Sequence, residues 1–471
     1  MNLKQHIGDT IFTVVADQAS RLGHEVYVIG GFVRDILLHR PNTDVDFVTD
    51  GNGIELAEAC AKAMGIKHIN IFKNFGTAHF RMGEWDYEFV GARKESYARH
   101  SRKPEVEPGS IADDQKRRDF TINAMAISLN KNSLGELVDP FNGIGDLKKK
   151  LIRTPLDPDI TYSDDPLRMM RAVRFSAQLH FHIEEESFNA IRKNSSRLQI
   201  ISMERISTEL NKIILTEKPG NGFKVLFQTG LLHEFFPEMV KLHGVERRKG
   251  LAHKDNFFHT LQVLDNLCKT SDKLWLRWSA ILHDIAKPAT KRFYDGEGWT
   301  FHGHEDVGAR MVPKIFSRLK LPLDHHMKYV QKMVQLHLRP IALTKEEVTD
   351  SAIRRLLFEA GDDVDDLMLL CQADITSKNE SKVQRYLENY EVVKRKLVEV
   401  EQKDQIRNFQ PPISGELIME TFGIVPGPEV GIIKNAIKDA ILDGVIHNNY
   451  EEAFEFMLEK GNEIGLKILH K

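Results

Sequence analysis

The hydrophobic pattern of this chain changes near Ser163, and that change limits the possible folds more than any other feature of the sequence. Before it, short apolar runs such as EVYVIGG, DVDFVTD, TAHFRM and YEFVGA predict strands, while residues 53–65 have a helical spacing that stops at Gly65. After it, apolar residues recur at helical spacing almost throughout. A part that mixes strands and helices, followed by a long helical part, predicts a multidomain α+β protein.

The length of the chain also requires several domains. With 471 residues it is too long for one ordinary hydrophobic core. Proline and glycine cluster at 154–159, 217–222, 243–250 and 409–415, where breaks are expected. We therefore divide the chain into an α/β head (1–153), an all-α neck (154–222), a histidine-rich helical module (223–395) and a helical tail (396–471).

Composition excludes several classes of protein. Hydrophobic residues make up 41% and charged residues 28%, as in globular proteins. No apolar run approaches the roughly 18 residues of a membrane span, and the N-terminus reads as an amphipathic helix rather than a signal peptide. Cys60, Cys268 and Cys371 are far apart, which fits a reducing cytosol, so we expect a cytoplasmic protein that does not contact membranes. A net charge of −3 confines any RNA contact to a patch.

The Gly30-Gly31 pair follows a predicted strand and opens a predicted helix. Glycines let a backbone approach a phosphate closely, and the start of a helix offers free N–H groups. Arg34, one turn later, adds a guanidinium that suits phosphate oxygens. A plain strand-to-helix connection is the alternative interpretation.

Asp44 and Asp46 are two residues apart on a predicted strand, so both side chains point to the same face. Two carboxylates on one face repel each other unless a cation lies between them, and Mg²⁺ prefers oxygen ligands together with substrate phosphates. Two such ions can hold the attacking and leaving oxygens of an in-line displacement. The alternative is a solvated strand edge.

Four motifs in the head resemble those of a known family. GGFVRD (30–35) and DVD (44–46) resemble the signature of the polymerase-beta-like nucleotidyltransferases, while RRDFTINA (117–124) and VDPFNG (138–143) resemble motifs of their bacterial and eukaryotic tRNA nucleotidyltransferase and poly(A) polymerase branch. The motifs occur in the order typical of that family. The resemblance implies a five-stranded head, a small mixed sheet with helices, that carries Mg²⁺ as cofactor.

The same resemblance assigns roles to single residues of the head. It implies that Asp44 and Asp46 are catalytic and bind Mg²⁺, and that Gly31, Arg34 and Arg118 contact phosphate or ribose. Glu88 is either a third carboxylate near the metal or an ordinary surface residue of its strand.

The neck begins with a helix, for which Ser163 or Asp164 is expected to be the cap and Pro166 to lie in the first turn. This segment resembles the EDxxR motif with which the family selects bases, with Asp164 where glutamate is usual. The resemblance implies that a set of carboxylate and guanidinium groups imitates a base-pairing partner. The members of this nucleotide-binding set are Asp165, Arg168, Arg171 and Arg174. A capped helix with a surface Asp–Arg pair is the alternative.

Residues 91–118 carry eight Lys or Arg and five Asp or Glu, without apolar periodicity. We expect a mobile loop. It resembles the flexible loop of enzymes that switch from adding C to adding A, and a disordered basic surface loop is the alternative.

Histidine and aspartate recur along the helical module in the order H…HD…H…H…D, which resembles the HD phosphohydrolase superfamily. The expected ligands of a divalent metal of unspecified identity are His259, His283, Asp284, His304, His337 and Asp374. His253 and His302 match this pattern less well. The implied reaction is hydrolysis of a phosphomonoester or a 2′,3′-cyclic phosphodiester by metal-activated water.

Several functions remain open at this point. The first is addition of C, C and A from CTP and ATP to the 3′ end of tRNA, with the HD site used in repair of that end. Poly(A) polymerase is the second hypothesis, although such enzymes of this branch typically lack an HD module, and a partial enzyme that adds only CC or only A is the third. The fourth hypothesis, from another functional class, is a hydrolase whose head is inactive. The sequence leaves the oligomeric state open.

Overall fold

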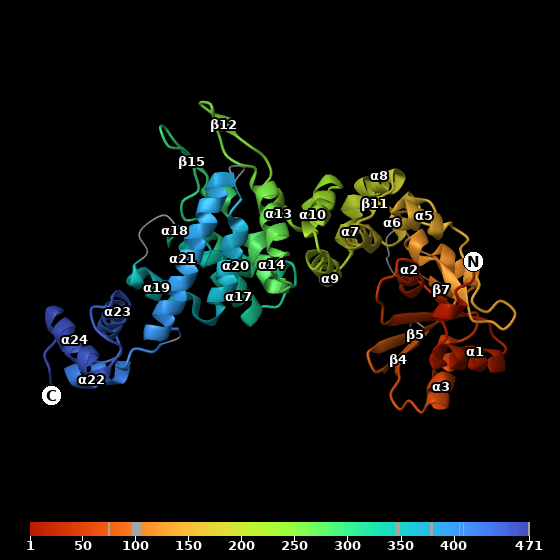
Figure 1. Ribbon diagram of the computed structural model, residues 1–471, viewed down its shortest axis with the longest axis horizontal. Coiled ribbons are helices and arrows are strands. Elements are labelled where there is room, and N and C mark those ends of the chain that lie inside the picture. The colour runs from red at the N-terminus through yellow and green to blue at the C-terminus, as the bar shows by residue number, and fades with distance from the viewer. Residues whose placement is uncertain are drawn as a thin grey trace. The chain divides into compact units, whose positions relative to one another are not determined.

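The computed structural model describes residues 1–73, 76–96, 105–343, 349–376, 380–404, 406–407 and 409–469. They form two compact units, Met1–Val240 and Lys241–Lys471, which carry the colours red to yellow-green and green to blue in Figure 1. The first unit contains the expected head and neck. The division into four domains stays a prediction.

A seven-stranded mixed sheet is the framework of the first unit, with the strand order β3-β4-β5-β2-β1-β8-β9. Its strands are β1 (Val26–Ile29), β2 (Asp44–Thr49), β3 (Asn70–Phe72), β4 (Thr77–Met82), β5 (Trp85–Gly91), β8 (Ala126–Ser128) and β9 (Leu137–Val138). Strands β2 and β5 are parallel, and the other neighbours are antiparallel. The expectation of five strands was wrong, because the edge strands β3 and β9, of three and two residues, are too short to leave an alternating pattern.

One face of this sheet is apolar and packs against helices. Val45 and Phe47 on β2 are each 1% exposed, which confirms that they face the core. The Phe47 ring lies 4.9 Å from Phe89 of β5 and 5.9 Å from Phe12, measured between centroids. Phe12 belongs to α1 (Thr10–Leu22), which packs against both β1 and α3 (Gly53–Met64) (Figure 1).

The remaining elements of the first unit are mostly helical. The helices are α2 (Gly31–Leu37), α4 (Ile111–Lys116), α5 (Gly143–Lys149), α6 (Pro158–Asp164), α7 (Leu167–Leu179), α8 (Glu185–Asn194), α9 (Met203–Ile214), α10 (Pro219–Gln228), α11 (Leu231–Phe235) and α12 (Pro237–Val240). Short 3-10 turns are η1 (Lys4–His6), η3 (Thr121–Asn123) and η4 (Ser195–Ile200). Strand β10 (Leu151–Ile152) pairs in parallel with β11 (His182–Ile183).

The start of the neck helix differs from the expectation. Ser163 and Asp164 do not cap it, because they are the last two residues of α6. Pro166 is the residue before α7, and the Asp165 carboxylate accepts a hydrogen bond from the Leu167 N–H at 3.2 Å. A proline cannot donate a backbone N–H, so it interrupts the helix and passes the capping role to Asp165.

The basic segment 91–118 contains more regular structure than expected. Strand β6 (Arg93–Ser96) pairs antiparallel with β7 (Glu105–Pro108), and α4 follows with a Ser110–Asp113 capping box. The sequence did not predict these elements, because alternating charged residues leave no apolar period. The middle of the expected flexible loop, residues 97–104, lies outside the described residues.

The second unit is mainly helical. Its helices are α13 (Asn256–Leu267), α14 (Leu274–Leu282), α15 (Lys287–Thr290), α16 (His304–Arg318), α17 (His325–Leu336), α18 (Leu338–Leu343), α19 (Asp350–Ala360), α20 (Val364–Asp374), α21 (Glu380–Asp404), α22 (Gly415–Phe422), α23 (Pro428–Asp443) and α24 (Tyr450–Glu463), with the turn η5 (Gly361–Asp363). Two hairpins interrupt them: β12 (Arg247–Arg248) with β13 (Leu251–Ala252), and β14 (Arg292–Tyr294) with β15 (Gly298–Thr300). Within the described part of the chain, no helix is both long and apolar enough to cross a membrane.

The aromatic core of the first unit generates a stability prediction. Phe47→Ala removes a ring that is 1% exposed, and we expect it to destabilise this unit by about 3–5 kcal/mol, because the cavity cannot close fully. Thermal unfolding followed by circular dichroism measures the effect. Phe72→Ala, at a ring that is 51% exposed, is the control and is expected to change stability by less than about 0.5 kcal/mol. Equal effects of the two variants would contradict the assignment of the core.

Candidate active site and metal centre

Four carboxylates lie side by side on the open face of the sheet in the first unit. Parallel pairing of β2 with β5 brings Asp44 next to Asp86 and Asp46 next to Glu88. His79, on β4, is the neighbour of Glu88 on the other side, and its Nε2 lies 2.9 Å from the Asp86 carboxylate. The prediction that Asp44 and Asp46 share a face is confirmed, and two further acidic residues extend the pair.

A cavity of about 640 Å³ covers this acidic face. Most of the residues expected to act in the head and neck line it: Gly31, Arg34, Asp44, Asp46, Glu88, Arg118, Arg171 and Arg174. Gly30, which was expected in the phosphate-binding turn, also lines it. The remaining lining residues were not expected there: Asp35, Pro41, Asn42, Thr43, Val45, His79, Asp86, Asp119, Asn123, Phe175 and Gln178.

Gly30, rather than Gly31, is the glycine that the geometry requires. Its φ is +86°, a conformation that other residues rarely adopt. A Cβ atom there would lie 3.0 Å from the Arg118 guanidinium and 3.2 Å from an Asp46 oxygen. Because Gly30, at the end of β1, has no side chain, Arg118 can approach the Asp46 carboxylate on β2.

The carboxylate row calls for a cation. Burial raises the pKa of Asp46, Arg118 opposes that rise, and Glu88 and Asp44 add to it, with a result of about 6. A raised carboxyl pKa means that the site disfavours a further bare negative charge. The oxygen-only donor set of Asp44, Asp46 and their neighbours on β5 suits Mg²⁺, which prefers such ligands and brings substrate phosphates with it.

Three arginines that line the cavity surround a single aromatic ring. The guanidinium carbons of Arg34, Arg171 and Arg174 lie 5.0, 5.4 and 4.2 Å from the centroid of Phe175. Contact with a ring face stabilises cations and keeps them apart from each other. The cavity therefore has a concentrated positive surface in addition to the acidic row. Phe175 was missed because its aromatic character alone predicts only core packing.

Each of these arginines is also held by a carboxylate. Arg34 donates two hydrogen bonds to Asp35 at 2.9 and 2.8 Å, and Arg171 donates to Asp119 at 2.7 Å. Arg174 Nε lies 3.1 Å from Glu209 in an ion pair. Asp119 is buried, yet its pKa is held at about 2: burial raises it, and the Arg171 charge together with hydrogen bonds from Asn123 and Arg171 outweighs that effect. The arginines are thus positioned before any ligand arrives.

Asp165 and Arg168 are the predicted residues that the structure keeps apart from the cavity. Both belong to the described residues, and neither lines it. The Asp165 carboxylate caps α7, and Arg168 donates from Nη2 to the backbone oxygen of Arg117 at 2.7 Å. Arg168 is thereby tied to the segment that carries Arg118.

In the second unit, the six expected metal ligands come together. They arrive on α13 (His259), directly after α14 (His283 and Asp284), at the start of α16 (His304), directly after α17 (His337) and at the end of α20 (Asp374).

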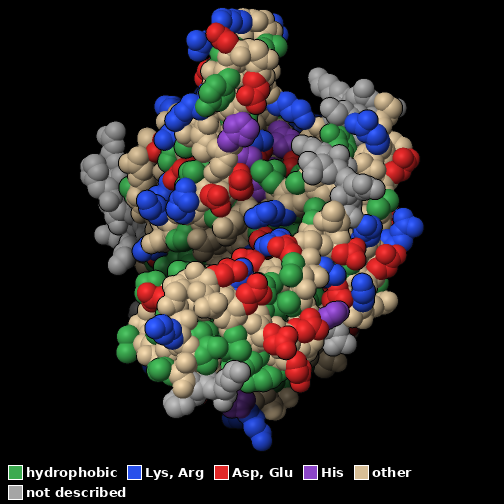
Figure 2. Space-filling model, turned by 90° about the vertical axis from the view of Figure 1, so that its left-hand side faces the viewer, with side chains coloured by type: hydrophobic (Ala, Val, Ile, Leu, Met, Phe, Trp, Pro, Cys, Tyr) green, Lys and Arg blue, Asp and Glu red, His purple; other side chains and the backbone are tan. Residues whose placement is uncertain are grey.

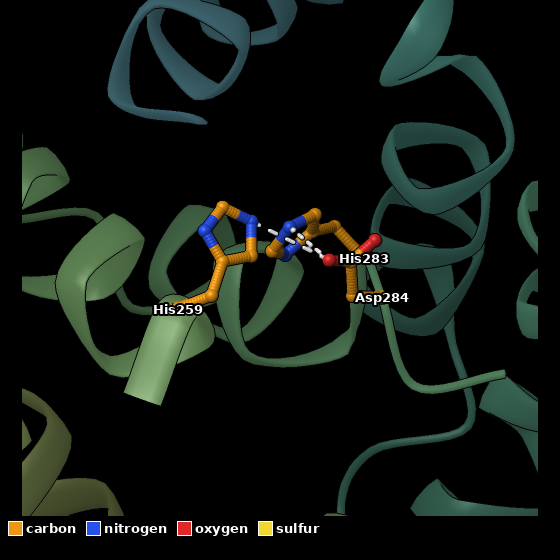
Figure 3. A group of neighbouring side chains, drawn as sticks. All are labelled: His259, His283 and Asp284. Carbon is orange, nitrogen blue, oxygen red and sulfur yellow. Dashed lines mark ion pairs between the residues drawn. The ribbon is translucent and has the colours of Figure 1, made fainter. Parts of the chain in front are cut away.

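Short distances connect the group. His259 Nε2 lies 3.4 Å from Asp284, and His283 Nε2 lies 3.3 Å from it (Figure 3). His259 Nε2 also lies 2.9 Å from Asp374. His304 Nε2 lies 3.2 Å from the other oxygen of Asp284. Asp284 is therefore the centre of the cluster.

The histidine ring orientations fit a metal. In His283, His304 and His337 the Nδ1 atom contacts the carbonyl oxygen three residues earlier, at 2.7, 2.8 and 2.6 Å, so Nδ1 must donate. Each Nε2 then points inward with a lone pair, which is the arrangement of metal-binding histidines. The Nε2 atoms of His304 and His337 lie 3.3 Å apart, and buried His283 Nε2 finds no hydrogen-bond partner among the described residues. Lone pairs that face one another require a cation between them.

The electrostatics of the cluster agree with this requirement. Burial lowers the pKa of His283, but Asp284 and Asp374 outweigh burial and raise it to about 10. Without another cation, the site therefore holds a proton. Lys287 donates a hydrogen bond to Asp284 at 2.6 Å. This lysine was not predicted to belong to the site, although its position one helical turn after Asp284 indicates that the two side chains can meet.

Family comparisons agree with this geometry. Residues 26–153 match the family model "Poly A polymerase head domain", 180–242 match "Probable RNA and SrmB- binding site of polymerase A", and 256–378 match "HD domain". The first match contains the acidic row, and the third contains all six residues of the metal cluster.

Three relatives and one solved structure resemble the chain. An A-adding tRNA nucleotidyltransferase of Aquifex aeolicus is 42% identical over 42% of this chain, which spans only 24% of that relative. One of Deinococcus radiodurans is 30% identical, with 88% of this chain and 90% of the relative covered. A CCA-adding enzyme of Lactobacillus johnsonii is 29% identical, covering 94% and 95%. The apo structure of a CCA-adding enzyme shares the fold, with a TM-score of 0.66 at 23% identity over 98% of this chain and 99% of that one.

The ligand arrangement in the second unit predicts the effect of one substitution on metal binding. We expect His337→Ala to weaken Mn²⁺ binding by the full chain at least about tenfold, because it removes a preoriented Nε2 donor. Calorimetric titration of chelator-treated protein measures the affinity. His302→Ala, at a side chain that is 79% exposed, is the matched control and should leave it unchanged. Equal affinities of wild type and His337→Ala would exclude His337 as a ligand.

Proposed function

Because the chain belongs to the tRNA nucleotidyltransferase and poly(A) polymerase family, we propose that it adds C, C and A from CTP and ATP to the 3′ end of tRNA without a nucleic-acid template. The observation that carries the proposal is the cavity that both the acidic row and a group of arginines line. A metal ion and a triphosphate together match that distribution of charge. The A-adding relatives support a second candidate, addition of the terminal A alone.

The proposed roles follow the charges. Asp44 and Asp46 hold Mg²⁺, with Glu88 beside them as a third carboxylate. A bound magnesium supplies charge neutralisation to the transferring phosphoryl group and orients the 3′-hydroxyl. Arg34, with its Nη1 on Asn123 at 2.8 Å, and Arg118 bind the triphosphate.

We propose that α7 chooses the base. Arg171 and Arg174 of α7 line the cavity, Arg168 lies in the first turn of the same helix, and Asp165 directly precedes it. Since Arg168 is bound to the Arg117 carbonyl, it reaches a base only after that contact opens or after the helix moves. A template made of side chains needs such a change, because two different bases must be accepted in turn.

For the second unit we propose metal-dependent hydrolysis of a phosphomonoester or 2′,3′-cyclic phosphate. The Nε2 atoms of His283, His304 and His337 hold the divalent ion together with Asp284. Lys287 neutralises the phosphate beside it. A bound metal supplies an activated water. Clearing a phosphate from a damaged tRNA 3′ end makes its hydroxyl available for addition, which gives the two activities a shared purpose.

One assay separates the alternatives. tRNA transcripts that end before, within and after CCA are incubated with each nucleotide separately. Incorporation of CTP into the transcript that lacks CCA supports complete addition, whereas incorporation of ATP only, into the transcript ending in CC, supports the A-adding alternative. Repeated ATP addition to any RNA would instead identify a poly(A) polymerase.

We predict that the two chemistries are separable. Asp46→Ala is expected to lower nucleotide addition by about a hundredfold or more, because a lost metal site forfeits several kcal/mol of transition-state stabilisation. Hydrolysis of 2′,3′-cyclic AMP should be unchanged. His283→Ala is expected to do the reverse, and Glu84→Ala, in the exposed turn between β4 and β5, is the control. Loss of both activities in either variant would contradict separate sites.

A further prediction concerns base choice. Arg168→Ala is expected to lower discrimination between ATP and GTP by roughly 10- to 100-fold with a smaller effect on triphosphate binding, because a lost hydrogen-bond partner reduces selectivity. Competition between the two nucleotides on a tRNA ending in CC measures it. Arg192→Ala, an exposed arginine on α8, is the control. Unchanged discrimination would remove Arg168 from base selection.

A further inference from the structure

A second cavity, of about 450 Å³, lies beside the metal cluster of the second unit. Two metal-cluster residues, His259 and Asp374, belong to its wall, so it gives direct access to that cluster. Its volume falls within the about 300–1,000 Å³ of small-molecule sites. Its other lining residues are Leu251, Ala252, His253, Lys254, Asn256, Lys287, Glu297, Gly298, Trp299 and Phe301.

One side of this cavity is an aromatic wall. Trp299, on β15, and Phe301 both meet the His253 ring edge-on, with centroids 5.5 and 5.8 Å away. The imidazole is held in place, since its Nδ1 donates to the Lys254 carbonyl at 2.7 Å and its Nε2 accepts from the Glu246 N–H at 3.2 Å. Strands β13 and β15 contact each other, which joins the two hairpins into one structure.

Positive charge surrounds the aromatic wall. Lys287 Nζ lies 5.6 Å from the Phe301 ring centroid and 2.6 Å from Asp284, so a cation stands between the wall and the metal cluster. Residues 245–254 and 287–302 carry seven Lys or Arg against three acidic residues, although the whole chain is net negative. Figure 2 shows Lys and Arg side chains along the projecting segment at the top of the view and histidine side chains below it.

We propose that this cavity is a nucleobase subsite, in which the 3′-terminal base of single-stranded RNA packs against Trp299 and Phe301 while its terminal phosphate reaches Lys287 and the metal cluster. The proposal rests on the hydrolytic function proposed above for this unit. Aromatic rings combined with lysines are the features by which proteins bind single strands, because every base has a face that stacks and every linkage carries a charge. A site for a small phosphate alone would need the cations but not the aromatic wall.

The test compares substrates with and without the terminal base. Two short single-stranded RNAs, each carrying a 3′-phosphate, serve as substrates: the last nucleoside is adenosine in one and an abasic ribose in the other. The release of phosphate by the full-length enzyme is measured. Phe301→Leu and Trp299→Leu are each expected to raise KM for the adenosine-ended RNA roughly tenfold, with kcat little changed. KM for the abasic RNA should not change, and Phe301→Tyr should restore the wild-type value.

Tyr294→Leu is the matched control, because this aromatic residue lies on the same hairpin, is 52% exposed and does not line the cavity. Equal KM changes for both RNAs, or no change in either leucine variant, would overturn the subsite.

Failure of the hydrolytic function gives a distinct result. If wild-type enzyme releases no phosphate with Mg²⁺, Mn²⁺, Co²⁺ or Ni²⁺, fluorescence anisotropy of the labelled RNAs decides the subsite alone. Weaker binding of only the adenosine-ended RNA by Phe301→Leu supports it, and identical binding by all variants rejects it.

Discussion

Backbone pairing between β2 and β5 holds like charges together, and the chemistry of the first unit depends on that constraint. Ladder hydrogen bonds keep neighbouring strands about 4.8 Å apart, so the carboxylates of Asp46 and Glu88 cannot separate without breaking the sheet. Their repulsion is relieved only by a proton, by Arg118 or by a metal. The raised pKa of Asp46, at about 6, reflects relief by a proton. The glycine at position 30 leaves room for Arg118 beside this carboxylate.

In the second unit, helices instead of strands bring the side chains of the metal cluster together. Five helices deliver ligands from distant parts of the chain, and a hydrogen bond to a backbone carbonyl sets the tautomer of three histidines. Because each Nδ1 donates to a backbone carbonyl, each Nε2 is left for the interior. Asp284 is the shared partner, which explains why an aspartate follows a histidine directly at this position.

Much of both sites could be predicted, and what escaped prediction has a physical cause. Alternation placed Asp44 and Asp46 on one face, and the spaced histidines of the second unit indicated side chains that the structure brings together. Asp119 and Asn123 were not predicted, because they act through contacts with arginines that are distant in sequence. Phe175 was not predicted, because its role depends on several arginines that surround one ring. The capping of α7 was misjudged because an entire short helix, α6, ends where the cap was expected.

The sequence by itself determined the class of the protein: its periodicity set a mixed head before a helical remainder, and its motifs gave the residues proposed to bind metal in both units. These properties are local, since the direction of a side chain follows from the period of its own strand or helix. Only the tertiary structure decided the number of strands, the arginine wall around Phe175 and the aromatic wall of Trp299 and Phe301. Those features arise where elements distant along the chain pack together, and no local pattern specifies which surfaces will meet.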